Sequence, residues 1–178
     1  MRSRMLSLLA AAVVCGWSIG ALASAFVAHA AGCPVEGWTG TSGPDVRYDD
    51  TDGVDEDNQW FALDGSDLLR SLACDDSVVR GEGGGDDLGG GSGSDYVEGD
   101  GGNDTVAGGA GNDSLFGNDD ADSLQDNQTG DTDDAHGGPG DDPSIDVQDG
   151  DGNDSADGGL GSDHCVTDGG DSRSGCES

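Results

Sequence analysis

Aspartate and glycine recur together at a nine-residue interval through the centre of this 178-residue chain. From residue 81 to residue 125 the sequence divides without a gap into GEGGGDDLG, GGSGSDYVE, GDGGNDTVA, GGAGNDSLF and GNDDADSLQ. The sixth position of each nonapeptide is aspartate: Asp86, Asp95, Asp104, Asp113 and Asp122. Hard cations bind several oxygen ligands at once, so carboxylates that recur in a fixed pattern are suited to neutralisation by such ions. The spacing therefore indicates repeated cation binding.

A second column of residues indicates the elements that must position these carboxylates. The eighth position of each nonapeptide is aliphatic: Leu88, Val97, Val106, Leu115 and Leu124. One short strand per unit can bury such a residue in a thin core, but only if neighbouring units stack, because a single unit cannot bury it alone. The same pattern continues upstream with fewer glycines, through Asn58-Gln59-Trp60, Asp67-Leu68-Leu69 and Asp76-Ser77-Val78. The sequence therefore predicts a repeat architecture of stacked units.

The composition excludes several classes of protein. The chain has 38 acidic and 6 basic residues, for a net charge of −32, together with 35 glycines and only 4% aromatic residues. Aspartate and glycine are poor helix formers, and so acidic a surface repels nucleic acid. Low hydrophobicity with high net charge is typical of disorder, unless cations neutralise the carboxylates and the glycines recur in register. We expect a helix-poor chain that does not bind nucleic acid.

Three of the units, GGSGSDYVE, GGAGNDSLF and GGLGSDHCV (158–166), resemble the G-G-x-G-x-D-x-U-x nonapeptide of the hemolysin-type calcium-binding (RTX) repeats, where U is a large aliphatic residue. The resemblance covers about half of the chain. It implies an all-β fold, a right-handed parallel β-roll in which six residues form a turn, three form a strand, and two repeats complete one coil. It also implies that Asp86, Asp104 and Asp122 lie along one edge, and Asp95, Asp113 and Asp131 along the other.

The resemblance further implies several Ca²⁺ ions, each shared between turns eighteen residues apart. Glycine at position four allows backbone dihedrals that other residues avoid, and Asp100 and Asn118 at position two can also adopt them. We expect the tightest binding between the turns of Asp86 and Asp104 and between those of Asp95 and Asp113, with weaker binding towards Asp131. The expected metal-site residues are Asp86, Asp95, Asp104, Asp113, Asp122, Asp131, Asp154, Asp163, Gly84, Gly93, Gly102 and Gly111.

The chain divides into six expected regions: a signal peptide (1–30), an irregular N-terminal cap (31–57), degenerate repeats (58–80), the calcium β-roll (81–134), an irregular break (135–148), and C-terminal repeats with a disulfide-closed end (149–178). The break is expected because Asp133 falls at position eight, where a carboxylate cannot be buried unpaired in a narrow apolar interior. The cap is expected because the end of a solenoid otherwise exposes core.

The N-terminal residues have the features of an export signal. Arg2 and Arg4 precede an apolar run from 5 to 28, and Ala28-His29-Ala30 has the small-x-small pattern of a signal-peptidase site. We expect a secreted, extracellular bacterial protein with no transmembrane span in the mature chain; the alternative is that this run is a membrane anchor. Exported chains favour disulfides, and of three possible pairings we expect Cys33–Cys74 and Cys165–Cys176, which bracket the repeats. The alternative for Cys33 is lipidation.

The expected function is calcium binding without catalysis. The line Ser162-Asp163-His164-Cys165 contains nucleophile, acid and base types, but catalytic groups normally converge from separate segments. We expect His136 and His164 to be solvated loop residues rather than zinc ligands. The apolar cluster of Trp60, Phe61, Leu63, Leu68, Leu69 and Leu72 is expected to be core of the degenerate repeats, and the alternative is a docking patch for a protein partner. A surface-attached spacer, held by a lipid on Cys33 or by that patch, is the alternative function.

Overall fold

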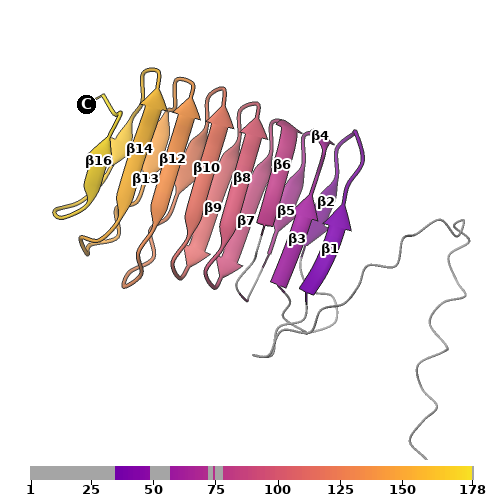
Figure 1. The fold of residues 1–178 in the computed structure, drawn as a ribbon, viewed down its shortest axis with the longest axis horizontal. Helices are drawn as coiled ribbons and strands as arrows, with labels where there is room; N and C mark the ends of the chain where they lie inside the picture. The colour runs from indigo at the N-terminus through magenta and orange to yellow at the C-terminus, as the bar shows by residue number, and fades with distance from the viewer. Residues whose placement is uncertain (1–34, 49–56, 72–73, 75–77, 178) are drawn as a thin grey trace, which may run out of the picture.

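The computed structural model describes residues 35–48, 57–71, 74 and 78–177. These residues form 16 β-strands and no helix, and the strands wind into a parallel β-solenoid of about 6 turns (Figure 1). The predicted all-β coil of stacked repeats is therefore confirmed. Within the described residues, no helix has the length and hydropathy needed to cross a membrane.

The chain alternates between two parallel sheets, which form the two walls of the coil. The first sheet contains β1 (Val35–Thr39), β3 (Asp57–Phe61), β6 (Val78–Gly84), β8 (Tyr96–Gly101), β10 (Ser114–Asp119), β12 (Asp134–Pro139), β14 (Ser155–Leu160) and β16 (Ser172–Ser174), and β4 (Asp64–Gly65) also pairs with β6. The second sheet contains β2 (Val46–Tyr48), β5 (Leu68–Arg70), β7 (Asp87–Ser92), β9 (Thr105–Ala110), β11 (Ser123–Gln125), β13 (Ser144–Asp146) and β15 (Cys165–Val166).

The position-eight residues form the core between the two sheets. In the register of β8 and β10, Val97 lies beside Leu115, and in that of β7 and β9, Leu88 lies beside Val106. Alternation along each strand points these side chains inward and their neighbours outward. The fully buried column consists of Trp60, Leu69, Val79, Leu88, Val97, Val106, Leu115, Leu124, Ala135, Ile145 and Ala156. Each of these strands thus contributes one fully buried position-eight side chain to a thin core between the sheets, and the strands hold it by pairing with the coils on either side.

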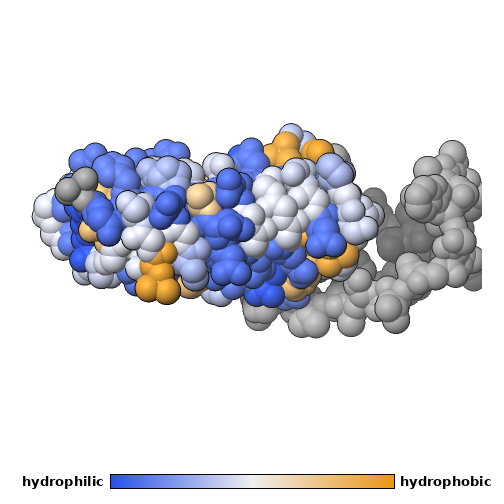
Figure 2. Space-filling model, turned by 90° about the horizontal axis from the view of Figure 1, so that it is seen from above, coloured by the Kyte–Doolittle hydropathy of each residue, from blue (hydrophilic) through white to orange (hydrophobic). Residues whose placement is uncertain are grey.

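Turns join the two sheets along two edges of the coil, at the top and bottom of Figure 1. The upper edge comprises the turns that lead from the first sheet to the second, and contains Asp67, Asp86, Asp104, Asp122, Asp142 and Asp163. The lower edge comprises the turns that lead back, and contains Asp95, Asp113, Asp133 and Asp154. Viewed from above, the molecule has a mainly hydrophilic surface with isolated apolar patches (Figure 2).

The irregular break expected at 135–148 is wrong. Strand β12 pairs with β10 and β14, and β13 pairs with β11 and β15, so both sheets pass through this stretch without interruption. The turn before β12 is two residues longer than the regular one. The insertion moves Asp133 out of the core position and into the turn, and Ala135 takes the buried place beside Leu115.

The N-terminal region is also more regular than expected. Within the expected cap, 35–48 contains strands β1 and β2, which pair with β3 and β5 of the degenerate repeats. Trp60 and Leu69 are fully buried, so the core interpretation is confirmed for these two. Phe61, Leu63 and Leu68 are half-buried, and a docking patch formed by them stays a prediction. The buried valine of the next strand is Val79 rather than Val78, because the extra residue precedes it.

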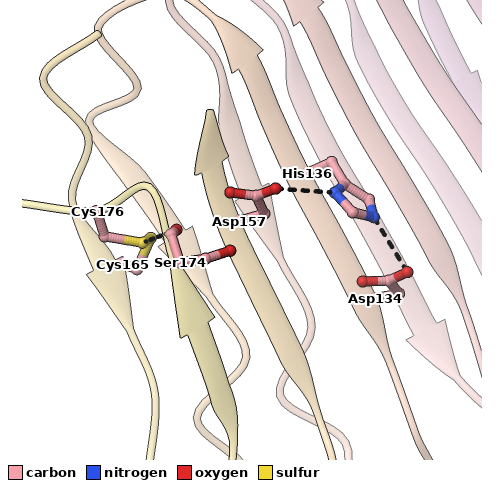
Figure 3. A network of polar contacts seen from close by, with 6 residues as sticks. All are labelled: Asp134, His136, Asp157, Cys165, Ser174 and Cys176. Carbon is pink, nitrogen blue, oxygen red and sulfur yellow. Dashed lines mark hydrogen bonds and ion pairs between the residues drawn. A yellow bond between two sulfur atoms is a disulfide. The ribbon is translucent and has the colours of Figure 1, made fainter. Parts of the chain in front are cut away.

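One of the two expected disulfides is present within the described residues. Cys165 and Cys176 are bonded, with their α-carbons 5.8 Å apart (Figure 3). Cys74 is also disulfide-bonded, but its expected partner Cys33 lies outside the described residues, so that pairing stays a prediction. The signal peptide, lipidation of Cys33 and the placement of Leu72 also concern residues that the structure does not describe.

Candidate metal centre

The position-six aspartates stack in two ladders, one along each edge. On the upper edge the backbone N–H of Asp86 donates to Oδ1 of Asp104 at 2.8 Å, and that of Asp104 donates to Oδ1 of Asp122 at 2.8 Å. On the lower edge the N–H of Asp95 donates to Oδ1 of Asp113, also at 2.8 Å. The ladders join residues 18 positions apart here, and 20 and then 21 positions apart in the later coils. The stacking predicted for the turns of Asp86 with Asp104 and of Asp95 with Asp113 is therefore observed.

The second carboxylate oxygen of these residues is buried and accepts no hydrogen bond from the described part of the chain. This holds for Oδ2 of Asp67, Asp86, Asp104, Asp113, Asp122, Asp142, Asp154 and Asp163. Each of these side chains is at most 3% exposed. A buried charge without a partner is strongly unfavourable, and such oxygens are normally paired or coordinate a metal. The upper ladder thus presents one unsatisfied acceptor per described turn, and the lower ladder presents one at Asp113 and one at Asp154.

Burial raises the pKa of these carboxyl groups well above that of a solvated aspartate. Loss of solvation is the main cause for Asp104, whose pKa rises to about 6, and for Asp122, whose pKa rises to about 7. The ladder N–H opposes the rise and the neighbouring carboxylates add to it. On the lower edge burial likewise raises the pKa of Asp113 and of Asp133 to about 7. Protons and cations therefore compete for the same oxygens.

Oxygens of adjacent coils converge where position one has no side chain. A β-carbon placed on Gly99 would lie 2.3 Å from Oδ2 of Asp104 and 2.9 Å from the carbonyl oxygen of Gly117 in the next coil. The same convergence recurs one coil later at Gly117, with Oδ2 of Asp122 at 2.3 Å and the next carbonyl oxygen at 2.7 Å. Carboxylate and carbonyl oxygens are the ligands that Ca²⁺ prefers. The donor set therefore fits a hard cation shared between coils.

The position-four glycines have the unusual backbone that the repeat requires. Gly84, Gly93, Gly102 and Gly111 have φ between 122° and 137°. A β-carbon on Gly102 would lie 1.5 Å from the carbonyl oxygen of Gly84, so a larger residue would push the two coils apart. At position two, Asp100 and Asn118 have φ of 72° and 73°, as expected from their tolerance of the left-handed region.

Asp131 is not a member of the lower ladder, contrary to the sequence-based register. The N–H of Asp113 donates to Oδ1 of Asp133 at 2.9 Å, while Oδ2 of Asp131 accepts the N–H of Gly111, also at 2.9 Å. The two-residue insertion causes this shift. Asp154 and Asp163 lie on opposite edges, where each accepts a ladder N–H from the coil before it.

Three residues of the upper ladder lie outside the expected site: Asp67, Asp142 and Glu177. Oδ1 of Asp142 accepts the N–H of Asp122 at 2.9 Å, and the N–H of Asp163 donates to Glu177 at 2.5 Å. The unit GGPGDDPSI (137–145) carries the signal for Asp142, because aspartate stands at its sixth position. No repeat signal marks Glu177, which lies after the last strand and accepts the final ladder N–H of the upper edge.

Extra carboxylates enter the lower edge where its turns are longest. One oxygen each from Asp113, Asp126 and Asp133 lies within 4.8 Å of the others, and all three side chains are buried. A second such group contains Asp149, Asp151 and Asp154, of which only Asp154 is buried. Asp126 was missed by the sequence analysis because it replaces the glycine expected at position one.

The residues considered for other chemistry are arranged differently. His136 lies on β12 between two carboxylates, with Nε2 3.0 Å from Oδ2 of Asp134 and Nδ1 3.8 Å from Oδ2 of Asp157 (Figure 3). Its two nitrogens face different aspartates, so these groups do not converge on one metal position. His136 is thus a strand residue and not the loop residue expected, and its ring stacks on Phe116 with centroids 5.1 Å apart. His164 is exposed.

The comparisons with known proteins agree with this geometry. The family model of the RTX calcium-binding nonapeptide repeat matches in 4 copies, over residues 89–124 and 146–173. These stretches contain Asp95, Asp104, Asp113 and Asp122 of the central coils, and Asp154 and Asp163 of the last ones. The unmatched stretch between them contains the first lengthened turn of the lower edge. No curated protein and no solved structure matches the chain.

Proposed function

This chain belongs to the RTX calcium-binding nonapeptide repeat family, and from that premise we propose that it is a secreted, non-enzymatic calcium-binding protein whose coil folds when the ion binds. The observation that carries the proposal is the set of buried Oδ2 atoms that accept no hydrogen bond from the described residues. They recur in each upper turn from Asp67 to Asp163, and at Asp113 and Asp154 on the lower edge. Calcium is the ion that fits these oxygens, because it prefers carboxylate and carbonyl ligands and is the ion that the repeat family binds.

On the upper edge, Oδ2 of Asp86, Asp104 and Asp122 would contribute the charged ligands. The carbonyl oxygens that converge with them, from Gly99, Gly117 and Gly137, would contribute neutral ligands from the adjacent coil. When bound, calcium supplies positive charge and fixes the two coils relative to each other. The chain's own residues shape the turn, exclude water from the carboxylates and hold Oδ1 on the ladder amide.

Coupling between binding and folding follows from the charge and the thin core. At a net charge of −32 the carboxylates repel one another in the folded coil. Burial of the thin core offsets only a small part of the backbone entropy that 35 glycines lose on folding. Each calcium site adds RT ln(1 + [Ca]/Kd) to the free energy of unfolding, which is about 1.4 kcal/mol when the free calcium concentration is ten times Kd. Several sites acting together are enough to move the equilibrium from unfolded to folded, because typical domains are stable by only about 5 to 15 kcal/mol.

Secretion is supported by the apolar N-terminal run with its cleavage pattern and by the Cys165–Cys176 disulfide, which favours an oxidising compartment. The absence of catalysis is supported by the structure of the segment 162–165, which contains nucleophile, acid and base residue types. Cys165 is in the disulfide, and Asp163 is buried in the upper ladder.

Circular dichroism and calorimetry on the full chain test the proposal. We expect the strand signal to be lost in EDTA at pH 7.5 and to return when calcium is added in excess. Asp104→Asn keeps an oxygen for the N–H of Asp86 but removes the charge, so it should lower the calcium heat by about one site's worth. An EDTA-treated chain with a full strand signal that calcium leaves unchanged would disprove the coupling.

A further inference from the structure

The lower edge departs from the repeat at Asp126. In the register of β11 and β9, Gln125 lies beside Ala107, so Asp126 takes the place that Gly108 has in the preceding coil. Its side chain is 2% exposed although it begins a turn. A carboxylate is therefore buried at a position where the repeat has no side chain at all.

The side chain of Asp126 reaches back into the preceding turn. Its Oδ2 accepts the N–H of Gly109 at 3.1 Å. A β-carbon on Gly108 would lie 2.0 Å from Oδ2 of Asp126 and 2.6 Å from Oδ2 of Asp113, so both carboxylates lie against the bare α-carbon of Gly108. Asp133 approaches from its own turn, where Oδ1 accepts the N–H of Asp113. Together the three residues offer one oxygen each within 4.8 Å.

This group is more than a surface cluster of acids. Oδ1 of Asp126 and Oδ2 of Asp113 are buried and accept no hydrogen bond from the described residues. The charged side chains that act on these two are themselves aspartates, so the nearby charges add to the repulsion. When all three are ionised, carboxylates in so small a buried volume require a positive charge among them; a proton shared between Asp113 and Asp126 is the competing arrangement.

We propose that Asp113, Asp126 and Asp133 form a three-carboxylate cation site that binds a calcium-sized ion more tightly than the turns of the upper edge do. The inference rests on the proposed function, because it assumes that the ladders bind calcium. Affinity for calcium rises with the number of charged ligands and with the rigidity of the site, and the longer turn supplies one carboxylate more than a regular turn. The same extra charge favours a trivalent ion over a divalent one. This order reverses the expectation that binding weakens towards residue 131.

The variant Asp126→Gly tests the site because it restores the residue of the preceding coil. Its matched control is Asp119→Gly: Asp119 lies beside Gly101 in the register of β10 and β8, is exposed, and carries the same charge. Calcium titration of the full chain by calorimetry gives the affinities, and displacement of calcium by terbium chloride gives the preference for charge. We expect Asp126→Gly to weaken the tightest calcium site about tenfold or more and to reduce the terbium preference, with Asp119→Gly within about twofold of the parent.

The outcomes separate this inference from the function on which it rests. If Asp126→Gly leaves the tightest site unchanged while Asp104→Asn weakens calcium binding, the three-carboxylate site is wrong and calcium binding by the ladders stands. A full chain that binds no calcium overturns both. Circular dichroism at saturating calcium verifies that the variant folds; should Asp126→Gly fail to fold, Asp126→Asn is measured in the same way, since it removes the charge at constant size.

Discussion

The two edges of the coil obey different length rules. On the upper edge, turns of six residues run from position one to the ladder aspartate in every unit, as in Gly81–Asp86 and Gly158–Asp163. On the lower edge, the first two such turns, 90–95 and 108–113, have six residues, whereas 126–133 and 147–154 have eight. The strands and the core stay in register on both sides of the longer turns. Among the described turns, the two insertions lie on the lower edge, and the strands tolerate them because a longer turn leaves the backbone hydrogen bonds of strand pairing intact.

The difference between the edges is also chemical. The upper turns repeat one arrangement, in which a single carboxylate oxygen per turn has no hydrogen-bond partner among the described residues. The longer lower turns add Asp126, and later Asp149 and Asp151, to the ladder residue. Variation in the length of one edge therefore changes the number of charged ligands without changing the fold, and the two edges are expected to differ in affinity for the same ion.

The largest expected effect comes from the turn glycines. Gly102→Ala on the upper edge combines a φ of 125° with a β-carbon 1.5 Å from the carbonyl oxygen of Gly84 in the preceding coil, a clash that neither coil can relieve by rotating a side chain. Gly130 in the lengthened lower turn has a φ of 95°, but a β-carbon there meets no atom within 4 Å. We expect Gly102→Ala to destabilise by about 4 kcal/mol or more, and Gly130→Ala by about 1 kcal/mol. Urea unfolding at saturating calcium measures both, and equal effects would contradict the difference between the regular turns and the lengthened one.

The pH dependence of the metal-free chain should come next in size. Burial raises the pKa of Asp122 on the upper edge and of Asp113 on the lower edge to about 7, from 3.8 in a solvated chain. Protons therefore favour the folded coil: this stabilisation is complete below about pH 4 and is lost as the pH rises through 7. In EDTA we expect more strand signal by circular dichroism at pH 5 than at pH 8. With calcium present the apparent affinity should instead fall towards pH 5, because protons displace the ion. A metal-free chain more folded at pH 8 would contradict this.

The smallest expected effect has the opposite sign. Asp120 occupies position four on the upper edge with a φ of 81°, where the neighbouring coils have Gly102 and Gly140. Asp120→Gly removes the left-handed strain of a non-glycine residue, and the greater freedom of the unfolded chain offsets part of the gain. We expect a net stabilisation of about 0.5 kcal/mol by urea unfolding. A loss of stability would mean that the Asp120 carboxylate contributes to the upper edge more than its exposure indicates.

Much of the central fold could be predicted from the sequence because each key position of the repeat has one residue type, and that residue type has one structural role. Asp104 and Leu115 illustrate this: a carboxylate at position six lies in a turn, and an aliphatic residue at position eight lies in the core. Glycine at positions one and four marks the turns, and the stacking of coils eighteen residues apart was implied by the resemblance to the RTX repeat, in which two repeats complete one coil. The pairing of Cys165 with Cys176 was foreseen for a similar reason, since it closes one end of the repeats.

The rest could not be predicted because it depends on backbone pairing, which leaves no signature in the side chains. Strands β1 and β2 pair with the next coil without any glycine or aspartate repeat of their own. A two-residue insertion shifts every later position, so Asp131 was assigned the place that Asp133 holds, and strands β12 and β13 were mistaken for a break. Asp126 could not be predicted as a ligand because it stands at position one, where the repeat has glycine and therefore no side chain.

The direction of the ladder hydrogen bonds implies an order in which the coils are completed. Every ladder N–H donates towards the C-terminus, from Asp45 to Asp67 at the beginning and from Asp163 to Glu177 at the end of the upper edge. A polypeptide that emerges N-terminus first, from a ribosome or through a pore, therefore always carries one unfinished coil whose amide awaits an oxygen about twenty residues behind it. The last acceptor to arrive, Glu177, closes the whole row.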